Sequence, residues 1–580
     1  IQVNGTLNYK DTFKDKHNLD VMVGSEYFGY NEFMMEAKTQ NSPTDDIPTL
    51  NAGATRTSTT SQKTGYRIAS VFGRINYNYQ MKYLLSLVAR YDGISRLKDN
   101  RWGFFPGVSV GWNVTEEDFW KESKISEVIS NIKPRLSYGV NGNVNGIGNF
   151  DIYGIYKQIG AGNYDGATAY YNSSLINTGL RWEQSRSFEA GLDLGFFNNR
   201  LSFIFDYYNR TTDDLLTDVN LPAYTGFSSM KTNLGKLRNS GFEMEVRANI
   251  LSNAKGFNWE VSANLTSVSN KVLKLPTSDK PFNQIDGYEV AAGLYNPETG
   301  ETPTKWIGGY REGGKLGDMV GYVQNHIFRD WNDVKANANM VIDEVANLYG
   351  PGMANEINPQ TGVTYAESNG WKPIEPGDVC WEDINKDGKI NSLDRAVVGN
   401  IFPKVTGGFS TTLSYKNWSL YARFDYALGH TIYNDLKARS LGQYQGQFNI
   451  IDKVHDTWSE TNPDTDLPVF TYADQLNKKN ITRSNNGNTA VDNNSSRFYE
   501  KGDYLALREI TLSYSLPKKW IGKAGMQDAS VYVTGQNLFY ITGYDGVSPE
   551  PAVSTVYGRG IDNGRYPTPR TLLFGLSVTF

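Results

Sequence analysis

Apolar and polar residues alternate over segments of about ten residues or more, and this alternation constrains the fold more than any other feature of the chain. In residues 418–428, one side of the segment carries Trp418 and Leu420, whereas the other carries Arg423 and Asp425. Successive side chains of a β-strand point to opposite faces of a sheet, so such a segment has one apolar and one polar face. The same pattern recurs in residues 83–92 and 201–210.

The length of these segments predicts an all-β fold of the transmembrane type. A strand that crosses a bilayer at a tilt needs about 9–11 residues, whereas a strand of a soluble sandwich typically has about five or six. We therefore expect a transmembrane antiparallel β-barrel wall of about fifteen strands. They are expected at residues 1–12, 17–36, 64–79, 82–93, 102–114, 131–141, 181–197, 200–216, 229–250, 257–275, 404–415, 418–432, 496–516, 528–541 and 568–580.

The connections between these strands alternate between short and long, as in a membrane barrel with short periplasmic turns and long extracellular loops. Short turns are expected at 80–81, 198–199 and 416–417, and a short helix at 115–130 lies on the same side. Bacterial single-chain barrels have even strand numbers, so an odd number of strands is expected upstream of residue 1. The long connections are 37–63, 143–179, 276–403, 433–495 and 542–566.

Composition excludes several functions. The formal net charge of -5 gives no basic surface for nucleic acid. The chain has no apolar run long enough for a spanning helix. It has a single cysteine, Cys380, which cannot form an internal disulfide. No arrangement of catalytic residues is recognisable, so we expect that the chain is not an enzyme.

The last strand ends the chain with alternate apolar residues and an aromatic terminus. This pattern resembles the C-terminal assembly signal of outer-membrane proteins, and the alternative is an ordinary edge strand. An exposed apolar edge would be an aggregation hazard in a soluble protein, which favours the signal. The signal residues are Leu572, Phe574, Leu576, Val578 and Phe580.

Several motifs occur together in one order along the chain. They are Arg90-Tyr91-Asp92-Gly93, the segment 101–107 (RWGFFPG), the segment 137–143 (SYGVNGN), Leu180-Arg181-Trp182-Glu183 and Asn239-Ser240-Gly241-Phe242-Glu243. As an ordered set they resemble the SusC/RagA family of TonB-dependent outer-membrane transporters.

The resemblance implies that residues 1–580 are the C-terminal part of a barrel of 22 strands, with the plug domain and the first strands absent. It implies an outer-membrane protein of a Gram-negative bacterium, embedded in outer-membrane lipid. The intact protein would import glycans (oligosaccharides) or peptides, with energy from TonB acting through the absent plug segment. A SusD-like surface lipoprotein would form a lid, and a dimer of transporter–lid pairs is compatible with the family.

Two alternatives within the membrane class stay open. A passive porin would have an open lumen and short loops, whereas the connection 276–403 is long. A surface adhesin or hydrolase on a barrel anchor would need a compact domain inside that same connection. We expect 276–403 to be an extracellular loop region, because it shows little strand or helix periodicity.

A calcium loop is expected at 383–394, inside this long connection. Oxygen donors fall at the steps that EF-hand loops use, and Gly388 stands at the sharp turn. The alternative is an Asp- and Asn-rich turn held by side-chain-to-backbone hydrogen bonds. The expected ligands of a structural Ca²⁺ are Asp383, Asn385, Asp387, Lys389 through its carbonyl, Asn391 and Asp394.

Aromatic residues in the long loops are candidates for contact with the substrate, because aromatic rings stack on sugar rings. Packing of each ring against neighbouring loops is the alternative. The candidates are Tyr164, Tyr170, Tyr171, Tyr444 and Tyr557.

Overall fold

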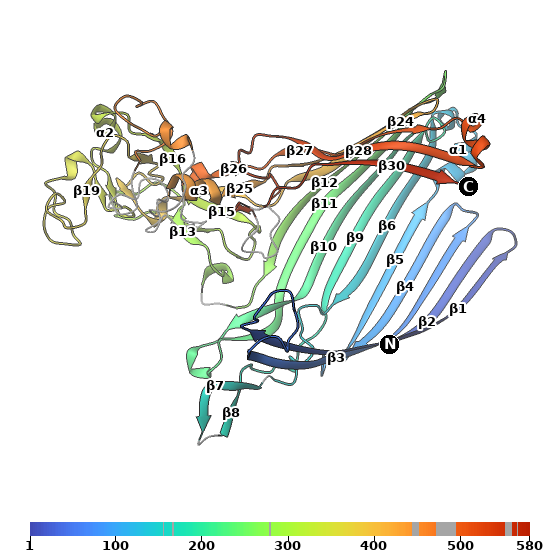
Figure 1. Ribbon diagram of the computed structural model, residues 1–580, viewed down its shortest axis with the longest axis horizontal. Helices are drawn as coiled ribbons and strands as arrows, with labels where there is room; N and C mark the ends of the chain where they lie inside the picture. Colours follow the sequence, from blue (N-terminus) through green and yellow to red (C-terminus); the bar gives the residue numbers. More distant parts are fainter. Residues whose placement is uncertain are drawn as a thin grey trace. The chain divides into compact units, whose positions relative to one another are not determined.

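The computed structural model describes residues 1–154, 156–164, 167–277, 280–442, 452–470, 495–550, 560–564 and 566–580. Its main element is an antiparallel sheet of fifteen strands (Figure 1). The strands follow one another across the sheet in sequence order. They are β1 (Gln2–Phe13), β2 (His17–Gln40), β3 (Thr55–Tyr79), β4 (Tyr83–Ile94), β5 (Trp102–Trp112), β6 (Ile129–Asn143), β9 (Glu183–Phe196), β10 (Leu201–Asn220), β11 (Ser229–Ala254), β12 (Phe257–Lys274), β23 (Val405–Tyr415), β24 (Trp418–Leu428), β27 (Tyr504–Ser515), β28 (Asp528–Thr542) and β30 (Thr571–Thr579).

This sheet confirms the strand count and nearly all the positions expected from the sequence. The strand expected at 64–79 begins earlier, at Thr55, so the expected connection 37–63 was too long. Two expected strands were too long by four residues or more. The strand expected at 418–432 ends at Leu428, because Gly429 adopts a φ of 82° and breaks the ladder before β25 (Thr431–Asn434). The strand expected at 496–516 begins only at Tyr504, and a short strand β26 (Tyr499–Lys501) precedes it.

The short turns have the backbone conformation that tight hairpins require. Gln80 and Met81 join β3 to β4 with φ of 51° and 59°, and Asn198 and Asn199 join β9 to β10 with φ of 55° and 59°. Positive φ at both central positions gives a turn whose twist matches that of the strands. The expected helix at 115–130 is present as helical turns, of which α1 is Asp118–Lys121, flanked by 3₁₀ turns at Val114–Glu116 and Lys124–Glu127.

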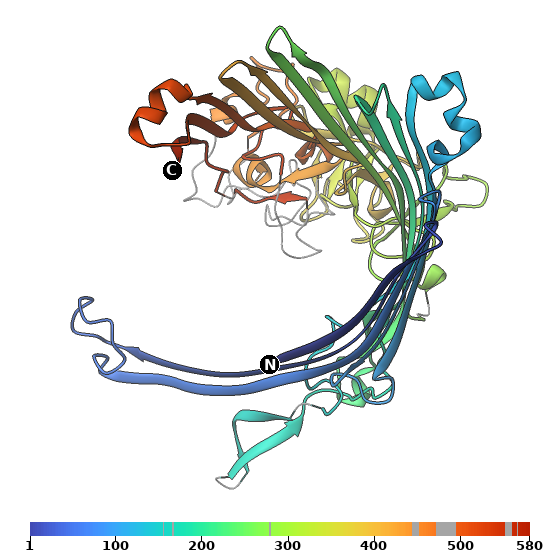
Figure 2. The same cartoon turned by 90° about the vertical axis from the view of Figure 1, so that its right-hand side faces the viewer.

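By internal contacts the chain divides into two compact units. One comprises Ile1–Phe242 with Asn270–Asp279, and the other comprises Glu243–Ser269 with Lys280–Phe580. In the first unit, β2 and β3 pair along their full length, so their hairpin continues beyond the N-terminus of β1 (Figure 2). The hairpin β7 (Tyr156–Tyr164) and β8 (Ala167–Asn172) lies at the end of the strands opposite to α1 (Figure 1).

The sheet register gives each unit one apolar and one polar face, because directly paired residues point to the same side. These two sides are named the apolar face and the polar face below. In the first unit, one row across the apolar face is Tyr77, Leu85, Val110, Leu136 and Ala190, and the adjacent row on the polar face is Asn76, Ser86, Ser109, Ser137 and Glu189. In the second unit, the corresponding rows are Leu413, Leu420, Leu512, Val533 and Phe574, and Ser410, Arg423 and Glu509.

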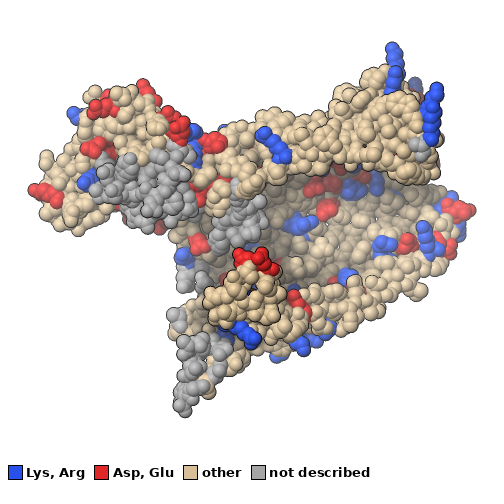
Figure 3. All heavy atoms as spheres, viewed as in Figure 1, with Lys and Arg blue, Asp and Glu red and all other residues tan. Residues whose placement is uncertain are grey.

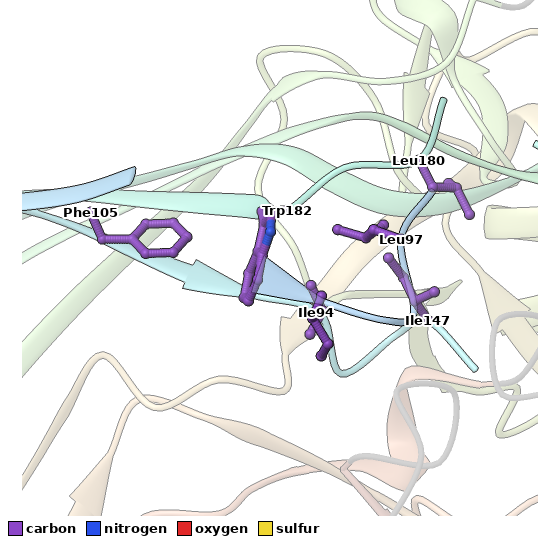
Figure 4. Packing of buried hydrophobic residues seen from close by; sticks show 7 residues of the cluster. Ile94, Leu97, Phe105, Ile147, Leu180 and Trp182 are labelled. Atoms are coloured by element: carbon purple, nitrogen blue, oxygen red, sulfur yellow. The ribbon is translucent and has the colours of Figure 1, made fainter. Parts of the chain in front are cut away.

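The first unit buries its apolar core at the long-loop ends of β4, β5 and β9, as Figure 4 shows. Phe105 packs edge-on against Trp182, with ring centroids 5.3 Å apart. The Trp182 indole donates to the Arg101 carbonyl oxygen at 3.0 Å, which ties the loop after β8 to the start of β5. Ile94, Leu97, Val144, Ile147 and Leu180 complete the cluster.

The connection 276–403 is not an extended loop within its described residues. It folds into short strand ladders around helix α2 (Trp331–Ala338), which Asp330 caps by accepting hydrogen bonds from Asn332 N and Asp333 N. The expectation of little regular structure was wrong, because strands of two to six residues are too short to give a readable periodicity. They are β13 (Tyr288–Ala291), β14 (Thr304–Ile307), β15 (Asp318–Tyr322), β16 (Gln324–Ile327), β17 (Ile342–Asp343), β18 (Leu348–Tyr349), β19 (Lys372–Pro373), β20 (Val379–Trp381), β21 (Lys389–Ile390) and β22 (Arg395–Asn400).

The remaining elements lie nearer the C-terminus. Helix α3 (Asp435–Gly442) follows β25, which pairs with β26 and with β29 (Ile561–Asp562). Helix α4 (Lys518–Ile521) occupies the short connection between β27 and β28.

Candidate functional site

The polar face of the first unit carries ion pairs between neighbouring strands. Arg135 on β6 donates to Asp193 on β9 at 2.7 and 2.9 Å and to Asp206 on β10 at 3.2 Å. Acidic and basic side chains are interspersed on the surface turned to the viewer in Figure 3. The ion pairs of Arg135 thus give the polar face of the first unit both positive and negative side chains.

A hollow of about 320 Å³ lies beside Arg135 on strands β3–β6, β9 and β10. Its lining includes hydroxyl and amide groups, such as those of Ser86 and Asn76, which are hydrogen-bonded at 2.7 Å. Glu189 and Asp206 add carboxylates. Such a surface offers both donors and acceptors, which suits a solute rich in hydroxyl or amide groups.

On the polar face of the second unit, Arg508 of β27 joins residues from three other segments. Its guanidinium donates to Asp425 of β24 at 2.9 Å and to the Tyr540 hydroxyl of β28 at 3.0 Å, and it forms an ion pair with Glu550. The alternation placed Asp425 on the polar face, but it did not identify Arg508, because a bulge between Leu507 and Glu509 shifts the register there.

A second charged group lies among the long connections of the second unit. The Lys437 ammonium of α3 donates to Glu500 at 2.9 Å and to Asp545 at 2.8 Å, and its side chain is only 15% exposed. Burial lowers the pKa of Lys437, but the hydrogen bonds to Asp545 and Glu500 outweigh it, so the pKa rises above its ordinary value. Burial raises the pKa of Glu500. No local sequence signal indicates this group, because its members lie far apart in the chain.

The expected calcium loop is folded as a network of side-chain-to-backbone hydrogen bonds. Asp383 accepts from Gly388 N at 2.9 Å, and Asp387 accepts from Lys389 N at 2.7 Å. Asn391 and Asp394 form a capping box, in which Asp394 accepts from Asn391 N at 2.8 Å.

Burial, together with the charges of Asp383 and Asp387, raises the pKa of Asp394 to about 6. The described residues include no group of three His, Cys, Asp or Glu side chains already placed to hold a metal ion. The calcium site therefore stays a prediction.

The aromatic candidates are only partly described. Tyr170 and Tyr171 lie on β8, where the two residues are 65% and 48% exposed. Tyr164 ends β7, but its side chain lies outside the described residues, as do Tyr444 and Tyr557 entirely. A substrate role for these tyrosines stays a prediction.

Four of the residues expected as an assembly signal lie in β30, which pairs antiparallel with β28 at one edge of the sheet, and Phe580 follows directly after the strand ends at Thr579. The register places Phe574 opposite Val533 and Leu576 opposite Val531, on the apolar face. Phe574 is 82% exposed. The strand is confirmed, and its role in assembly stays a prediction.

Aromatic residues mark two levels on the apolar face of the first unit. Tyr79, Tyr83 and Trp112 stack in a row near the short turns, with centroid distances of 6.4 and 6.5 Å. Tyr91 and Trp102 stack at 5.0 Å near the long-loop ends of β4 and β5. Trp102 and Trp112 are about 33 Å apart along the strand. At a tilt of about 40°, this length corresponds to a depth of about 25 Å, which matches the height of the apolar band of a membrane barrel.

Comparison with known proteins agrees with this geometry. Residues 2–311 match the family model described as TonB dependent receptor-like, beta-barrel. TonB-dependent receptor P3 of Formosa agariphila is 30% identical over 99% of this chain and 52% of its own length. TonB-dependent receptor SusC of Bacteroides thetaiotaomicron is 30% identical over 97% of this chain and 48% of its own length. The chain thus spans about half the length of the curated relatives that it matches.

Among solved structures, that of the RagAB peptide transporter superposes with a TM-score of 0.73, covering 100% of this chain and 55% of that one, at 23% identity. That likeness concerns the fold. The fold and the two-faced sheet define an outer-membrane β-barrel protein. The chain belongs to the TonB-dependent receptor family, and the expected resemblance to its SusC/RagA type is confirmed. No helix in the described part of the chain is both long and apolar enough to cross a membrane.

Proposed function

We propose that the protein of which this chain forms the barrel wall imports glycans or peptides across the outer membrane, with energy supplied through TonB. The observation that carries the proposal is membership of the TonB-dependent receptor family, together with the match to SusC along almost the whole chain. RagAB, which shares the fold, is described as a peptide transporter. The choice between glycan and peptide stays open.

The polar face supports a neutral or zwitterionic oligomer as cargo. Some of its cations are paired with carboxylates, as at Arg135 and Asp193, and hydroxyl groups such as that of Ser86 lie nearby. A wall of this kind can exchange hydrogen bonds with hydroxyl or amide groups along a passing chain. Among the residues that the structure describes, this face carries both signs of charge and forms no single-sign ring of the kind expected of an anion- or cation-selective pore.

A SusD-like surface lipoprotein is the proposed partner, and the folded region 280–403 is proposed to lie outside the cell. The test is purification of the intact protein from outer membranes in mild detergent, with mass identification of what accompanies it. A lipoprotein of SusD type in a fixed ratio supports the partnership, and a dimer of such pairs would appear as twice that mass. Recovery of the protein alone under the same conditions would contradict it.

The transport proposal is tested by growth. A strain lacking the gene is supplied with oligosaccharides or peptides as the sole carbon source. The account expects loss of growth on at least one of these polymers and normal growth on its monomer. Restoration by the intact gene, but not by a gene whose TonB-contacting segment is deleted, separates active import from a passive pore.

We also propose that the 383–394 loop binds a structural Ca²⁺. Its ligands would be the side chains of Asp383, Asn385, Asp387 and Asp394, with Asn391 and the carbonyl of Lys389 completing the set. All these donors are oxygen atoms, which suits a hard cation. The loop also turns at Gly388, whose φ is 80°.

The ion would fasten the loop next to β22 without taking part in transport. Measuring the melting temperature of the intact protein in EDTA and in calcium tests this, with Asp387→Asn as the variant. Calcium should raise the melting temperature of the unaltered protein and leave that of the variant unchanged. Equal behaviour of both proteins would remove the site from the account.

Tyr170 and Tyr171 are the described residues proposed to contact the cargo. Replacing both with serine should weaken uptake of the cargo at low concentration while leaving the amount of protein in the membrane unchanged. Tyr224, which is 89% exposed in the connection between β10 and β11, is the matched control.

A further inference from the structure

A charged pocket lies on the apolar face of the first unit, where lipid is the expected neighbour. Asp213 on β10 pairs with Arg186 on β9 at 3.2 Å and with Lys236 on β11 at 2.7 Å. Arg186 pairs across the sheet with Val140 and Thr211, and the next row down is Tyr138, Phe188 and Asn209. The ion pairs therefore share the face of Tyr138 and Phe188, and not the polar face of Arg135.

The pocket has a volume of about 310 Å³ and includes both the aromatic rings and the charges in its lining. Tyr138 and Phe188 are 43% and 44% exposed. The side chains of Arg186 and Lys236 are 48% and 40% exposed, whereas that of Asp213 is 14% exposed. The two cations thus present an accessible surface, and the carboxylate lies beneath them.

The cations outnumber the acid. Arg238 lies two residues after Lys236 on β11. Farther along the same strand, Phe242 stacks on Phe205, which belongs to the apolar face. Because alternate residues of a strand point to the same side, Lys236, Arg238 and Phe242 share the apolar face. The contact of Arg186 with Asp213 is an ion pair, and within the described residues the side-chain hydrogen bond from the Arg186 guanidinium goes to Gln184, at 3.2 Å. Three cations and one carboxylate leave a net positive patch.

The depth of the patch places it at the outer boundary of the bilayer. Arg186 lies ten residues along β9 from Phe196 at the short turn. That is about 33 Å along the strand and about 25 Å across the membrane at a tilt of about 40°, which equals the height of the apolar band. Charged groups on the lipid face are costly at the midplane and tolerated near the interface, so this position suits contact with headgroups.

We propose that Arg186, Lys236 and Arg238 bind the phosphate of an anionic lipid in the outer leaflet, whose acyl chains lie along Phe188 and Tyr138. Guanidinium groups bind phosphate oxygens through paired hydrogen bonds. A soluble phosphate would gain nothing from the adjoining rings, whereas a lipid uses both parts of the pocket. The proposal rests on the outer-membrane location and is independent of what the protein imports.

The test is native mass spectrometry of the delipidated intact protein, titrated with phosphatidylglycerol and, in parallel, with zwitterionic phosphatidylcholine. The variant carries Arg186→Gln, Lys236→Gln and Arg238→Gln. The matched control carries Arg74→Gln, Lys133→Gln and Arg210→Gln, which remove the same charge from the polar face. The variant should bind phosphatidylglycerol about a hundredfold more weakly, roughly fivefold for each cation, and the control should bind as the unaltered protein does.

Three results would overturn the proposal. They are equal weakening in the control, equal binding of phosphatidylcholine, and displacement of the lipid by millimolar inorganic phosphate, which would indicate a soluble ligand. If the triple variant does not fold, Arg186→Gln alone should weaken binding about fivefold, and unchanged binding would again overturn it. Failure of transport in any of these proteins is a separate readout and does not bear on lipid binding.

Discussion

Replacing Leu87 with arginine tests which face of the sheet meets lipid. Leu87 lies in β4, four residues from Tyr83 and four from Tyr91, which belong to the two aromatic levels of the apolar face. Four residues are about 13 Å along the strand, or about 10 Å of depth at a tilt of about 40°. Leu87 is therefore near the midplane of the bilayer, beside Ile75 and Val108 on the neighbouring strands.

An arginine at the midplane of a membrane barrel costs about 2–4 kcal/mol of folding free energy. The neighbouring residue Ser86 is the control, because it points to the polar face and lines the hollow there. Ser86→Arg loses the hydrogen bond to Asn76, which is worth about 1 kcal/mol, and places its guanidinium beside water and the Glu189 carboxylate. Leu87→Arg should therefore cost at least about 1 kcal/mol more than Ser86→Arg.

The free energy of unfolding is measured by urea titration of the intact protein refolded into phospholipid vesicles. The amount of each variant in the outer membrane of cells gives an independent measure. The account expects the order unaltered protein, Ser86→Arg, Leu87→Arg in both assays. If the two arginine variants lose the same stability, or if Ser86→Arg loses more, the assignment of the faces is wrong.

Three further predictions concern the second unit. Lys437→Met should destabilise the contacts of α3 with β26 by about 3–5 kcal/mol, because it leaves the Glu500 carboxylate without its cation and Asp545 with only the exposed Lys453. Limited proteolysis should then cut near 435–442. Lys453→Met should change little, because that side chain is 53% exposed and Asp545 keeps its ion pair with Lys437. Burial raises the pKa of the Cys380 thiol to about 12, so the folded protein has almost no thiolate at pH 8. A maleimide should therefore label Cys380 only after denaturation, and rapid labelling of the folded protein would contradict its buried position. Phe574→Ser on the apolar side of β30 should lower the amount of assembled protein more than Ser577→Ala on the opposite side, as measured by heat-modifiable mobility on gels, and the reverse order would refute a signal carried by the apolar residues.

The large sheet could be predicted from the sequence because each strand carries its own evidence. Alternation over ten or more residues and turn residues such as Asn198 and Asn199 act locally, so a single sequence reveals them. The expected strand at 257–275 differs from β12 by a single residue at its end. Strands were expected too long at Gly429 and before Tyr504, where one glycine or a short turn divides an otherwise apolar run, and the start of β3 was missed because residues 55–63 are polar.

The folded region 280–403 could not be predicted in the same way. Its ladders consist of strands such as Ile342–Asp343 and Leu348–Tyr349, which pair with each other and also with β21 and β19, farther along the chain. Its core depends on buried residues scattered from Phe328 to Cys380. Two-residue strands have no period, so the sequence alone shows only polar and glycine-rich composition there.

The charged groups divide along the same line. The loop at 383–394 was recognisable because all its oxygen donors lie within twelve residues. The Lys437 group and the pairs of Arg508 with Asp425 and Glu550 join segments that are 42 to 108 residues apart. Such pairs arise only from tertiary structure, and no pattern in one sequence indicates which acid a given cation will meet.

Active import is the central claim, and accumulation of cargo against a gradient tests it most directly. Cells that carry the intact protein at its natural level are given a labelled oligosaccharide or peptide that supports growth, and the periplasmic concentration is measured with and without a protonophore. Active import should give a periplasmic concentration above that of the medium, and this excess should collapse when the proton gradient is removed. Entry that stops at the external concentration and ignores the protonophore would show a passive pore and contradict the account.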